Sequence, residues 1–239
     1  MKKEKISVSV IIPTYNRISK LFHLLKSLDQ LNPIPEEIII VDDNSNDGTI
    51  RLLGKWKAIK RGYHKKVISK VTNKGPADSR NLGIIKSKNK LVAFTDDDVI
   101  VHEKWVHFIT SKLLLDDNRL AGVGGSVKSV NNDILSNYFV EHKILEAPTH
   151  LNYLPTVNAC FKKASLTDIG GFDTKFNFAG GEDTDLCLRL RNEGYHFLKE
   201  PNALVYHDFS SNFIDFCKLW IKYGKGTQMA ILNSKRRKL

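Results

Sequence analysis

This sequence is short of cysteine, of long apolar runs and, near its C-terminal end, of acidic residues. Its 239 residues include only three cysteines, whose wide spacing fits neither a disulfide framework nor a metal-binding knuckle: Cys160, Cys187 and Cys217. No stretch approaches about 20 consecutive apolar residues, so no membrane-spanning helix is predicted. We therefore expect free thiols in a reducing compartment and a cytoplasmic protein.

Positive charge dominates the sequence and concentrates toward its C-terminal end. The formal net charge is +11, which would suit nucleic acid, an anionic membrane surface or a phosphorylated substrate. After Phe209 the only acidic residue is Asp215, whereas basic residues are frequent: Lys218, Lys222, Lys225, Lys235, Arg236, Arg237 and Lys238. No recognised nucleic-acid-binding motif accompanies this charge, so we expect no nucleic-acid partner.

Segment 210–239 combines the basic charge with apolar residues at helical spacing. These apolar residues are Phe213, Phe216, Leu219, Trp220 and Tyr223. Their spacing predicts an amphipathic helix over Asn212–Leu232. Such a helix either packs on the rest of the protein or binds an anionic membrane surface, where basic and aromatic side chains cooperate. Both alternatives remain open, and the second would place the protein at the cytoplasmic face of a membrane.

Residues 1–100 alternate short apolar runs with helix-like segments. The pattern predicts strands at Ser7–Ile12, Glu37–Val41, Lys66–Val71 and Leu91–Thr95, and helices at Ile18–Leu31, Ile50–Lys60 and Pro76–Ser87. Continuous apolar strands alternating with helices indicate an α/β fold with a mostly parallel central sheet, covered on both faces. Residues 101–209 are less regular and are expected to form the smaller half of the same domain, with strands predicted near His196–Leu198 and Ala203–Tyr206.

Acidic residues follow two of the predicted strands directly. Asp42 and Asp43 end the second strand, and Asp96-Asp97-Asp98 ends the fourth. Ligands of an open parallel sheet bind beyond the carboxyl ends of its strands, so both clusters should face one crevice. Adjacent carboxylates repel one another unless a cation or strong donors relieve them. Because Mg²⁺ and Mn²⁺ favour carboxylate oxygens together with substrate phosphates, we interpret this edge as a cation site rather than a solvated acidic turn.

The segment Asn73-Lys74-Gly75 is expected to lie beside the same crevice. It precedes a predicted helix, whose N-terminus favours anionic groups, and its glycine permits close approach of the backbone. Arg80 follows about one turn further along that helix. A glycine before a helix is common in itself, and the neighbouring acidic clusters are what favour a phosphate-binding role here.

A pair of glycines, Gly180-Gly181, is followed at once by Glu182 and Asp183 at the start of a predicted helix over Asp183–Asn192. Carboxylates in such a first turn either cap the helix or act in catalysis. A hydroxyl group is a poor nucleophile until a nearby base accepts its proton. The motif therefore makes one of these carboxylates a candidate general base.

With these motifs in place, the sequence resembles the family 2 glycosyltransferases of the GT-A fold, from about Ser7 to His207. Five segments match the family's motifs in its order: Val8–Arg17 (VSVIIPTYNR), Ile38–Thr49 (IIIVDDNSNDGT), Asn73–Ile84 (NKGPADSRNLGI), Ala93–Val99 (AFTDDDV) and Gly170–Leu190. The last segment is also similar to the C-terminal part of the family 7 galactosyltransferases. The resemblance implies a Rossmann-like nucleotide-binding half at 1–100, an acceptor-binding half at 101–209 and a C-terminal helix and tail at 210–239.

The resemblance also implies which residues bind the nucleotide-sugar donor. They are Pro13, Thr14, Tyr15, Arg17, Asp42, Asp43, Asn73, Lys74, Gly75, Arg80, Asp96 and Asp97. Within this set, Asp42 or Asp43 would contact the base or ribose. Lys74 and Arg80 would lie along the nucleotide and its phosphates, whereas Asp97 receives no individual role.

A Mn²⁺ or Mg²⁺ cofactor and a general base are implied as well. Asp96 and Asp98 match the first and last Asp of the D-x-D motif, with Asp98 as the main metal ligand. His207 matches a histidine that supplies a third ligand in many GT-A enzymes. Glu182 and Asp183 match the acceptor-side E-D motif, in which the Asp is the usual base. The implied reaction is a single inverting displacement, in which Asp183 deprotonates the attacking hydroxyl.

The sequence thus predicts a metal-dependent glycosyltransferase that uses a nucleoside-diphosphate sugar, with UDP as the default, and a hydroxyl acceptor on a glycan or a lipid-linked glycan. One rival is a nucleotidyltransferase or a retaining glycosyltransferase of the same fold, against which the E-D motif argues. Another is a non-catalytic protein that binds nucleotide-sugars or nucleic acid, against which the intact D-x-D and E-D pairs count.

Overall fold

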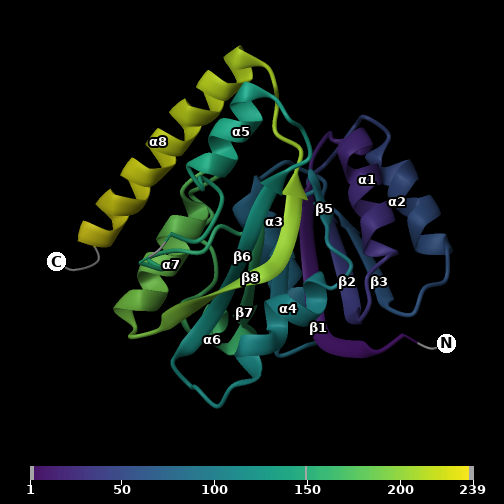
Figure 1. Ribbon diagram of the computed structural model, residues 1–239, viewed down its shortest axis with the longest axis horizontal. Helices are drawn as coiled ribbons and strands as arrows, with labels where there is room; N and C mark the ends of the chain where they lie inside the picture. Colours follow the sequence, from purple (N-terminus) through teal and green to yellow (C-terminus); the bar gives the residue numbers. More distant parts are fainter. Residues whose placement is uncertain (1–2, 149, 237–239) are drawn as a thin grey trace.

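The computed structural model describes residues 3–148 and 150–236, which form one sheet flanked by helices (Figure 1). The sheet has eight strands: β1 (Lys5–Thr14), β2 (Ile34–Asp42), β3 (His64–Ser69), β4 (Leu91–Thr95), β5 (Val99–Val101), β6 (Leu120–Ser129), β7 (Asn158–Lys162) and β8 (His196–His207). The helices are α1 (Ile18–Leu28), α2 (Thr49–Ala58), α3 (Pro76–Lys86), α4 (Trp105–Ser111), α5 (Ile134–Glu141), α6 (Lys163–Asp168), α7 (Glu182–Asn192) and α8 (Phe213–Arg236), with a 3-10 turn at Lys112–Leu114.

The strand order β3-β2-β1-β4-β7-β6-β8-β5 joins two differently built halves of the sheet. Strands β3, β2, β1 and β4 are parallel to one another. Strand β7 is antiparallel to both β4 and β6, whereas β6 and β8 are parallel and β5 is antiparallel to β8. The parallel first half confirms the predicted α/β fold, and it brings the carboxyl ends of β1, β2 and β4 to one edge.

The helices pack on the sheet through two apolar cores, one on each face. The first core buries Leu24 of α1 and Trp56 of α2, and the second buries Ile84 of α3. Neighbouring residues of β1 alternate between them, with Val10 in the first core and Ile11 in the second. Because these strands are covered on both faces, most of their positions are apolar, and the sequence shows them as nearly continuous apolar runs.

The structure differs from the sequence-based expectations mainly in residues 101–209. Two strands were predicted near His196–Leu198 and Ala203–Tyr206, but β8 is one strand whose register against β6 shifts between Gly124 and Ser126. The sequence pattern did not predict β5, α5 or α6, which have three, eight and six residues. Elements this short contain too few residues for a periodic pattern to be recognised. Strand β1 also continues through Pro13, where the pattern predicts that it ends.

Helix α8 corresponds to the amphipathic helix predicted for the C-terminal segment, and it runs beside α5 and over α7 (Figure 1). One side of it packs on the protein, with Phe216 against the first core and Ala230 buried in the second. The other side exposes Ile214 and Ile221. None of the helices within the described residues is long and apolar enough to cross a membrane. Arg237 and Lys238, together with the rest of the tail from 237 to 239, lie outside those residues.

Candidate active site

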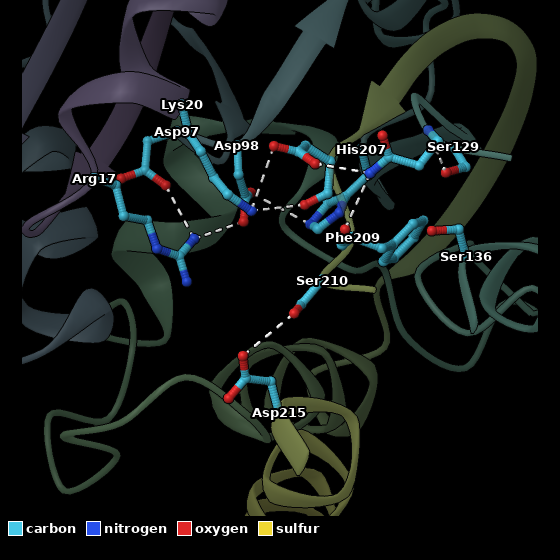
Figure 2. Close-up of polar contacts among 12 residues, drawn as sticks. Arg17, Lys20, Asp97, Asp98, Ser129, Ser136, His207, Phe209, Ser210 and Asp215 are labelled. Atoms are coloured by element: carbon cyan, nitrogen blue, oxygen red, sulfur yellow. Dashed lines mark hydrogen bonds and ion pairs between the residues drawn. The ribbon is translucent and has the colours of Figure 1, made fainter. Parts of the chain in front are cut away.

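The carboxyl ends of β1 and β4 lie side by side, and the polar side chains that end or follow these strands form hydrogen bonds and ion pairs with one another. The Thr14 hydroxyl donates to Asp97 Oδ2 at 2.7 Å. Arg17 Nη1 lies 3.2 Å from Asp97 Oδ1 and 2.6 Å from Asp98 Oδ2 (Figure 2). The Arg17 side chain is half exposed, whereas both carboxylates are nearly buried. The Arg17 guanidinium therefore relieves the repulsion between two adjacent carboxylates.

The two carboxyl groups respond differently to this environment. Burial raises the pKa of Asp97 to about 7, although Arg17 opposes the rise. Burial also disfavours the charge of Asp98, but His207, Arg17 and Lys20, together with a backbone hydrogen bond, outweigh it and hold the pKa of Asp98 below its ordinary value. Asp98 is consequently a carboxylate at neutral pH, which is the form that binds cations.

His207 reaches Asp98 because β8 pairs with β5, the strand that follows the acidic run. Val99 lies opposite His207 in this pair, and His207 Nε2 is 3.3 Å from Asp98 Oδ1. That oxygen is buried and has no hydrogen-bond partner in the described part of the chain. A carboxylate oxygen and an imidazole nitrogen so placed fit a divalent cation. No group of three potential ligands is found among the described residues, and Asp96, the predicted further ligand, forms an ion pair with Arg80.

The end of β2 shapes the loop before α3. The buried Asp43 carboxylate accepts the backbone N–H groups of Lys74 at 3.0 Å and Gly75 at 2.7 Å. Gly75 has a φ of 86°, and a Cβ at this position would lie 2.5 Å from the carbonyl oxygen of Asn177. Asp43 therefore positions the loop, and only glycine fits its conformation.

Arg80 links Asp96, at the end of β4, to Glu182, at the start of α7. Its side chain is 4% exposed, with Nη2 donating to Asp96 Oδ1 at 2.8 Å and Nη1 donating to Glu182 Oε1 at 2.9 Å. The sequence predicts that Arg80 lies along the phosphates of the donor. In the structure its guanidinium holds two carboxylates from different motifs, and no spacing in the sequence indicates this partnership.

The first turn of α7 presents Asp183 to a cavity. The turn begins at Gly180 and Gly181, which have φ values of 130° and 89°, and the Gly180 N–H donates to Glu182 Oε2 at 2.7 Å. Both oxygens of the Glu182 carboxylate are therefore bound, one by Arg80 and the other by the Gly180 N–H. Asp183 is half-buried, and its pKa is raised to about 7 by burial and by the adjacent charge of Glu182. A carboxyl group with a pKa near neutrality suits a general base.

Two cavities meet at Arg80 and Asp96, which line both. The cavity of about 310 Å³ is lined by ten residues that the sequence predicts to bind the donor: Pro13, Thr14, Tyr15, Arg17, Asp43, Asn73, Gly75, Arg80, Asp96 and Asp97. The cavity of about 520 Å³ contains Glu182 and Asp183. The predicted donor residues and the predicted base thus lie in adjoining spaces.

Some predicted residues lie elsewhere, and some lining residues were not predicted. Asp42 is buried at the end of β2, and in the described part of the chain neither cavity is lined by Lys74, Asp98 or His207. The lining residues that the sequence did not indicate include Asn177, Phe178, Lys222, His142, Tyr153, Trp220 and Tyr223. They come from loops and from α8, where no motif marks them.

Two models of known protein families match this chain. The model described as Glycosyl transferase family 2 matches residues 9–170, and a model described as N-terminal domain of galactosyltransferase matches residues 146–208. The first match spans more than half of the chain, which therefore belongs to glycosyl transferase family 2. This agrees with the resemblance seen in the five sequence motifs.

Two curated relatives illustrate the similarity. The Pre-mycofactocin glycosyltransferase of Mycobacterium tuberculosis is 30% identical over 235 residues, which cover 91% of this chain and 46% of the relative. The Chondroitin synthase of Pasteurella multocida is 26% identical over 242 residues, which cover 85% of this chain and 25% of the relative. The chain therefore spans about half, or less, of these relatives' length.

Solved structures share the fold. A mannosyltransferase from Pyrobaculum calidifontis, in complex with GDP-Man and Mn²⁺, has a TM-score of 0.67 at 20% identity and covers 86% of this chain and 58% of its own. Residues 1–349 of S. aureus TarS, in complex with UDP-GlcNAc, have a TM-score of 0.64 at 22% identity and cover 87% and 60%. At such identities the likeness concerns the fold, which is that of the GT-A glycosyltransferases.

Proposed function

We propose that this chain transfers a sugar from a nucleoside-diphosphate sugar to an acceptor hydroxyl, with inversion at the anomeric carbon. The observation that carries the proposal is the position of Asp183. This half-buried carboxyl group, with a pKa raised to about 7, lies in a cavity that adjoins the cavity of the donor residues. Inversion requires the attacking hydroxyl and the leaving group on opposite sides of the reacting carbon, which two adjoining cavities support.

The smaller cavity offers what a nucleotide-sugar needs. Tyr15 is 45% exposed and presents an aromatic face, and the half-exposed Arg17 provides a cation for phosphate oxygens. The N-terminus of α3, preceded by Gly75, favours a diphosphate. The TarS complex contains UDP-GlcNAc and the mannosyltransferase complex contains GDP-Man, so UDP- and GDP-sugars are the donors to test first.

Mn²⁺ or Mg²⁺ would be held by Asp98 and His207, with Asp96 as the predicted third ligand. Asp98 Oδ1 supports the assignment, because it is buried, lies 3.3 Å from His207 Nε2 and accepts no hydrogen bond from the described residues. When bound, such a cation supplies positive charge to the departing diphosphate. Arg17 lies 2.6 Å from Asp98 Oδ2 and would compete with the cation for this oxygen, and its half-exposed side chain could instead bind the donor phosphates.

The acceptor we propose is a glycan or a lipid-linked glycan. The outward side of α8 supports a lipid-linked one, because exposed apolar residues such as Ile214 and Ile221 alternate there with exposed Lys218 and Lys225. Such a combination of apolar and basic groups suits an anionic membrane surface.

A donor screen followed by an acceptor assay tests the proposal. A donor that binds the folded state raises the melting temperature, and at about one hundred times its Kd it stabilises by about 2.7 kcal/mol. UDP- and GDP-sugars are screened in this way with Mn²⁺, and the donor found is then used with glycan acceptors. Asp183→Asn should keep the melting shift and lose transfer, whereas Asp116→Asn, at an exposed loop position, should keep both. Undiminished transfer by Asp183→Asn would refute the assignment of the base.

A further inference from the structure

Helix α8 forms one wall of the cavity that contains Asp183. Three residues on successive turns of its inward side line this cavity, namely Trp220, Tyr223 and Thr227. Other residues that line it come from the segment after α5, including His142, and from the loop that contains Tyr153. Figure 1 shows α8 lying beside α5, and the residues of α8 that line the cavity therefore come from the helix that follows the sheet in sequence.

A contact between glycines docks α8 on the catalytic turn. The backbone of Gly226 touches that of Gly180 and Gly181, so closely that a Cβ on Gly226 would overlap the carbonyl oxygen of Gly180. A Cβ on Gly181 would in turn overlap Gly226. Since Gly181 immediately precedes Glu182 and Asp183, the position of α8 and the position of the proposed base are set by the same contact.

The aromatic residues of α8 are fixed by their neighbours. The rings of Trp220 and Phe139 of α5 are stacked at 6.4 Å, and those of Trp220 and Tyr223 meet edge-on at 6.2 Å. The Trp220 indole N–H is buried and has no hydrogen-bond partner in the described part of the chain. Burial and the nearby charge of Asp183 raise the pKa of Tyr223, so its phenol remains a neutral donor.

We infer that the inward side of α8 is a carbohydrate-binding wall, on which Trp220 and Tyr223 hold a pyranose ring of the acceptor with one hydroxyl directed at Asp183. This inference rests on the proposed function and specifies the acceptor of the same site. Aromatic faces carry partial negative charge that attracts the C–H faces of a sugar ring. Sugar hydroxyls match the polar groups of the cavity, which include Thr227.

A purely hydrocarbon occupant fits this cavity less well. It would leave Asp183, Arg80 and Asp96 facing an apolar group, and unpaired polar groups in such a place are unfavourable. A sugar ring has both an apolar face and a polar rim, and the cavity of about 520 Å³ lies within the usual range for small-ligand sites.

Two glycine variants of α8 test the docking contact. Gly226→Ala and Gly224→Ala make the same chemical change two residues apart, but a Cβ on Gly224 meets no atom within 4 Å. We expect Gly226→Ala to lower kcat of transfer by about 100-fold, as a misplaced catalytic group does, while the affinity for UDP with Mn²⁺ is retained. Gly224→Ala should leave both unchanged. Equal kcat values for the two variants would overturn the role of the contact, and UDP calorimetry verifies that Gly226→Ala is folded.

Tryptophan fluorescence tests the wall itself, without need of a donor. Of the three tryptophans, Trp56 and Trp105 are buried in the core, and Trp220 lines the cavity. Methyl glycosides of glucose, galactose, mannose and their N-acetylamino forms are titrated. At least one should change the fluorescence of the natural protein, and Trp220→Phe should abolish the change. No response to any glycoside, or a response that survives in Trp220→Phe, would overturn the inference.

A kinetic split separates this inference from the proposed function. Trp220→Ala should raise the KM for the responding methyl glycoside by about ten-fold, which corresponds to one aromatic contact, and should leave hydrolysis of the donor by water unchanged. An unaltered KM would refute the wall while transfer persists. Absence of any donor binding by the natural protein would instead refute the proposed function, and the fluorescence titration would still decide whether Trp220 binds sugar.

Discussion

Arg80 donates from Nη1 to Glu182 Oε1 at 2.9 Å, although the two residues are 102 positions apart in the chain. Through Nη2 the same guanidinium holds Asp96. One buried cation therefore fixes the carboxyl end of β4 relative to the first turn of α7. As a consequence, the acidic run after β4 and the acidic pair at the start of α7 are not independent, because a displacement of either carboxylate acts on the other through Arg80.

Removing this cation should destabilise the protein strongly. Arg80→Gln leaves Glu182 buried without a charge partner, and breaking a buried pair typically costs about 3–5 kcal/mol. The free energy of unfolding is measured from urea denaturation. Arg51→Gln, at an exposed position of α2, is the matched control and should change stability by less than about 0.5 kcal/mol. Equal free energies of unfolding for the two variants would mean that the ion pairs of Arg80 contribute nothing to stability.

Transfer should decline as the pH falls below 7. Asp183 accepts a proton only as a carboxylate, and its pKa is about 7. The value of kcat/KM should therefore rise with pH up to about 7 and level off above it, with about a ten-fold fall per pH unit on the acidic side. Rates are measured between about pH 5 and pH 9, with circular dichroism at each pH to verify folding.

Glu182 provides a check on this pH dependence. Its negative charge is one cause of the raised pKa of Asp183, so Glu182→Gln should move the acidic limb of the profile to lower pH. Asp183→Asn should remove the limb and lower the rate by about 10²–10⁴-fold. A limb that stays in place in Glu182→Gln, or persists in Asp183→Asn, would assign the titration to another group.

Cation binding should depend on Asp98 and His207. Asp98→Asn and His207→Gln are expected to weaken Mn²⁺ binding by about ten-fold or more, as measured by calorimetry in the presence of UDP. His196→Gln, at the other end of β8 and half exposed, is the control. Arg17→Ala should have the opposite effect on Mn²⁺ alone, because Arg17 lies 2.6 Å from Asp98 Oδ2 and competes for it. Weaker binding of Mn²⁺ by Arg17→Ala would contradict this competition.

The parallel half of the sheet could be predicted from the sequence because its signals are local. The run Leu91–Thr95 is apolar at every position before its last residue, and β4 has these bounds. Asp96 and Asp97 follow it, so their place at the edge of the sheet comes from chain continuity alone. Thr14 ends β1 and Arg17 follows it in the chain. Because β1 pairs in parallel with β4, both residues lie at the same edge of the sheet.

The cavity that contains Asp183 could be predicted less well from the sequence, because packing between distant segments forms it. The contact of Gly226 with Gly180 has no local pattern, since glycine in an amphipathic helix reads as a neutral or unfavourable residue. The pairing of Arg80 with Glu182 is equally non-local. Helix α8 shows the difference. Its periodicity predicts the helix and its two sides, but not the cavity that the inward side lines.

The outward side of α8 leads to the last prediction, which concerns membranes. Lys218 and Lys225 are exposed there, and each basic residue near an anionic surface contributes about 1 kcal/mol. Replacing both with Gln should reduce binding to vesicles of phosphatidylserine and phosphatidylcholine by about ten-fold or more. Replacing Lys55 and Lys57 of α2, which are also exposed, removes the same net charge and should have little effect. Cosedimentation measures both variants, and equal losses would mean that net charge alone, not the face of α8, drives the binding.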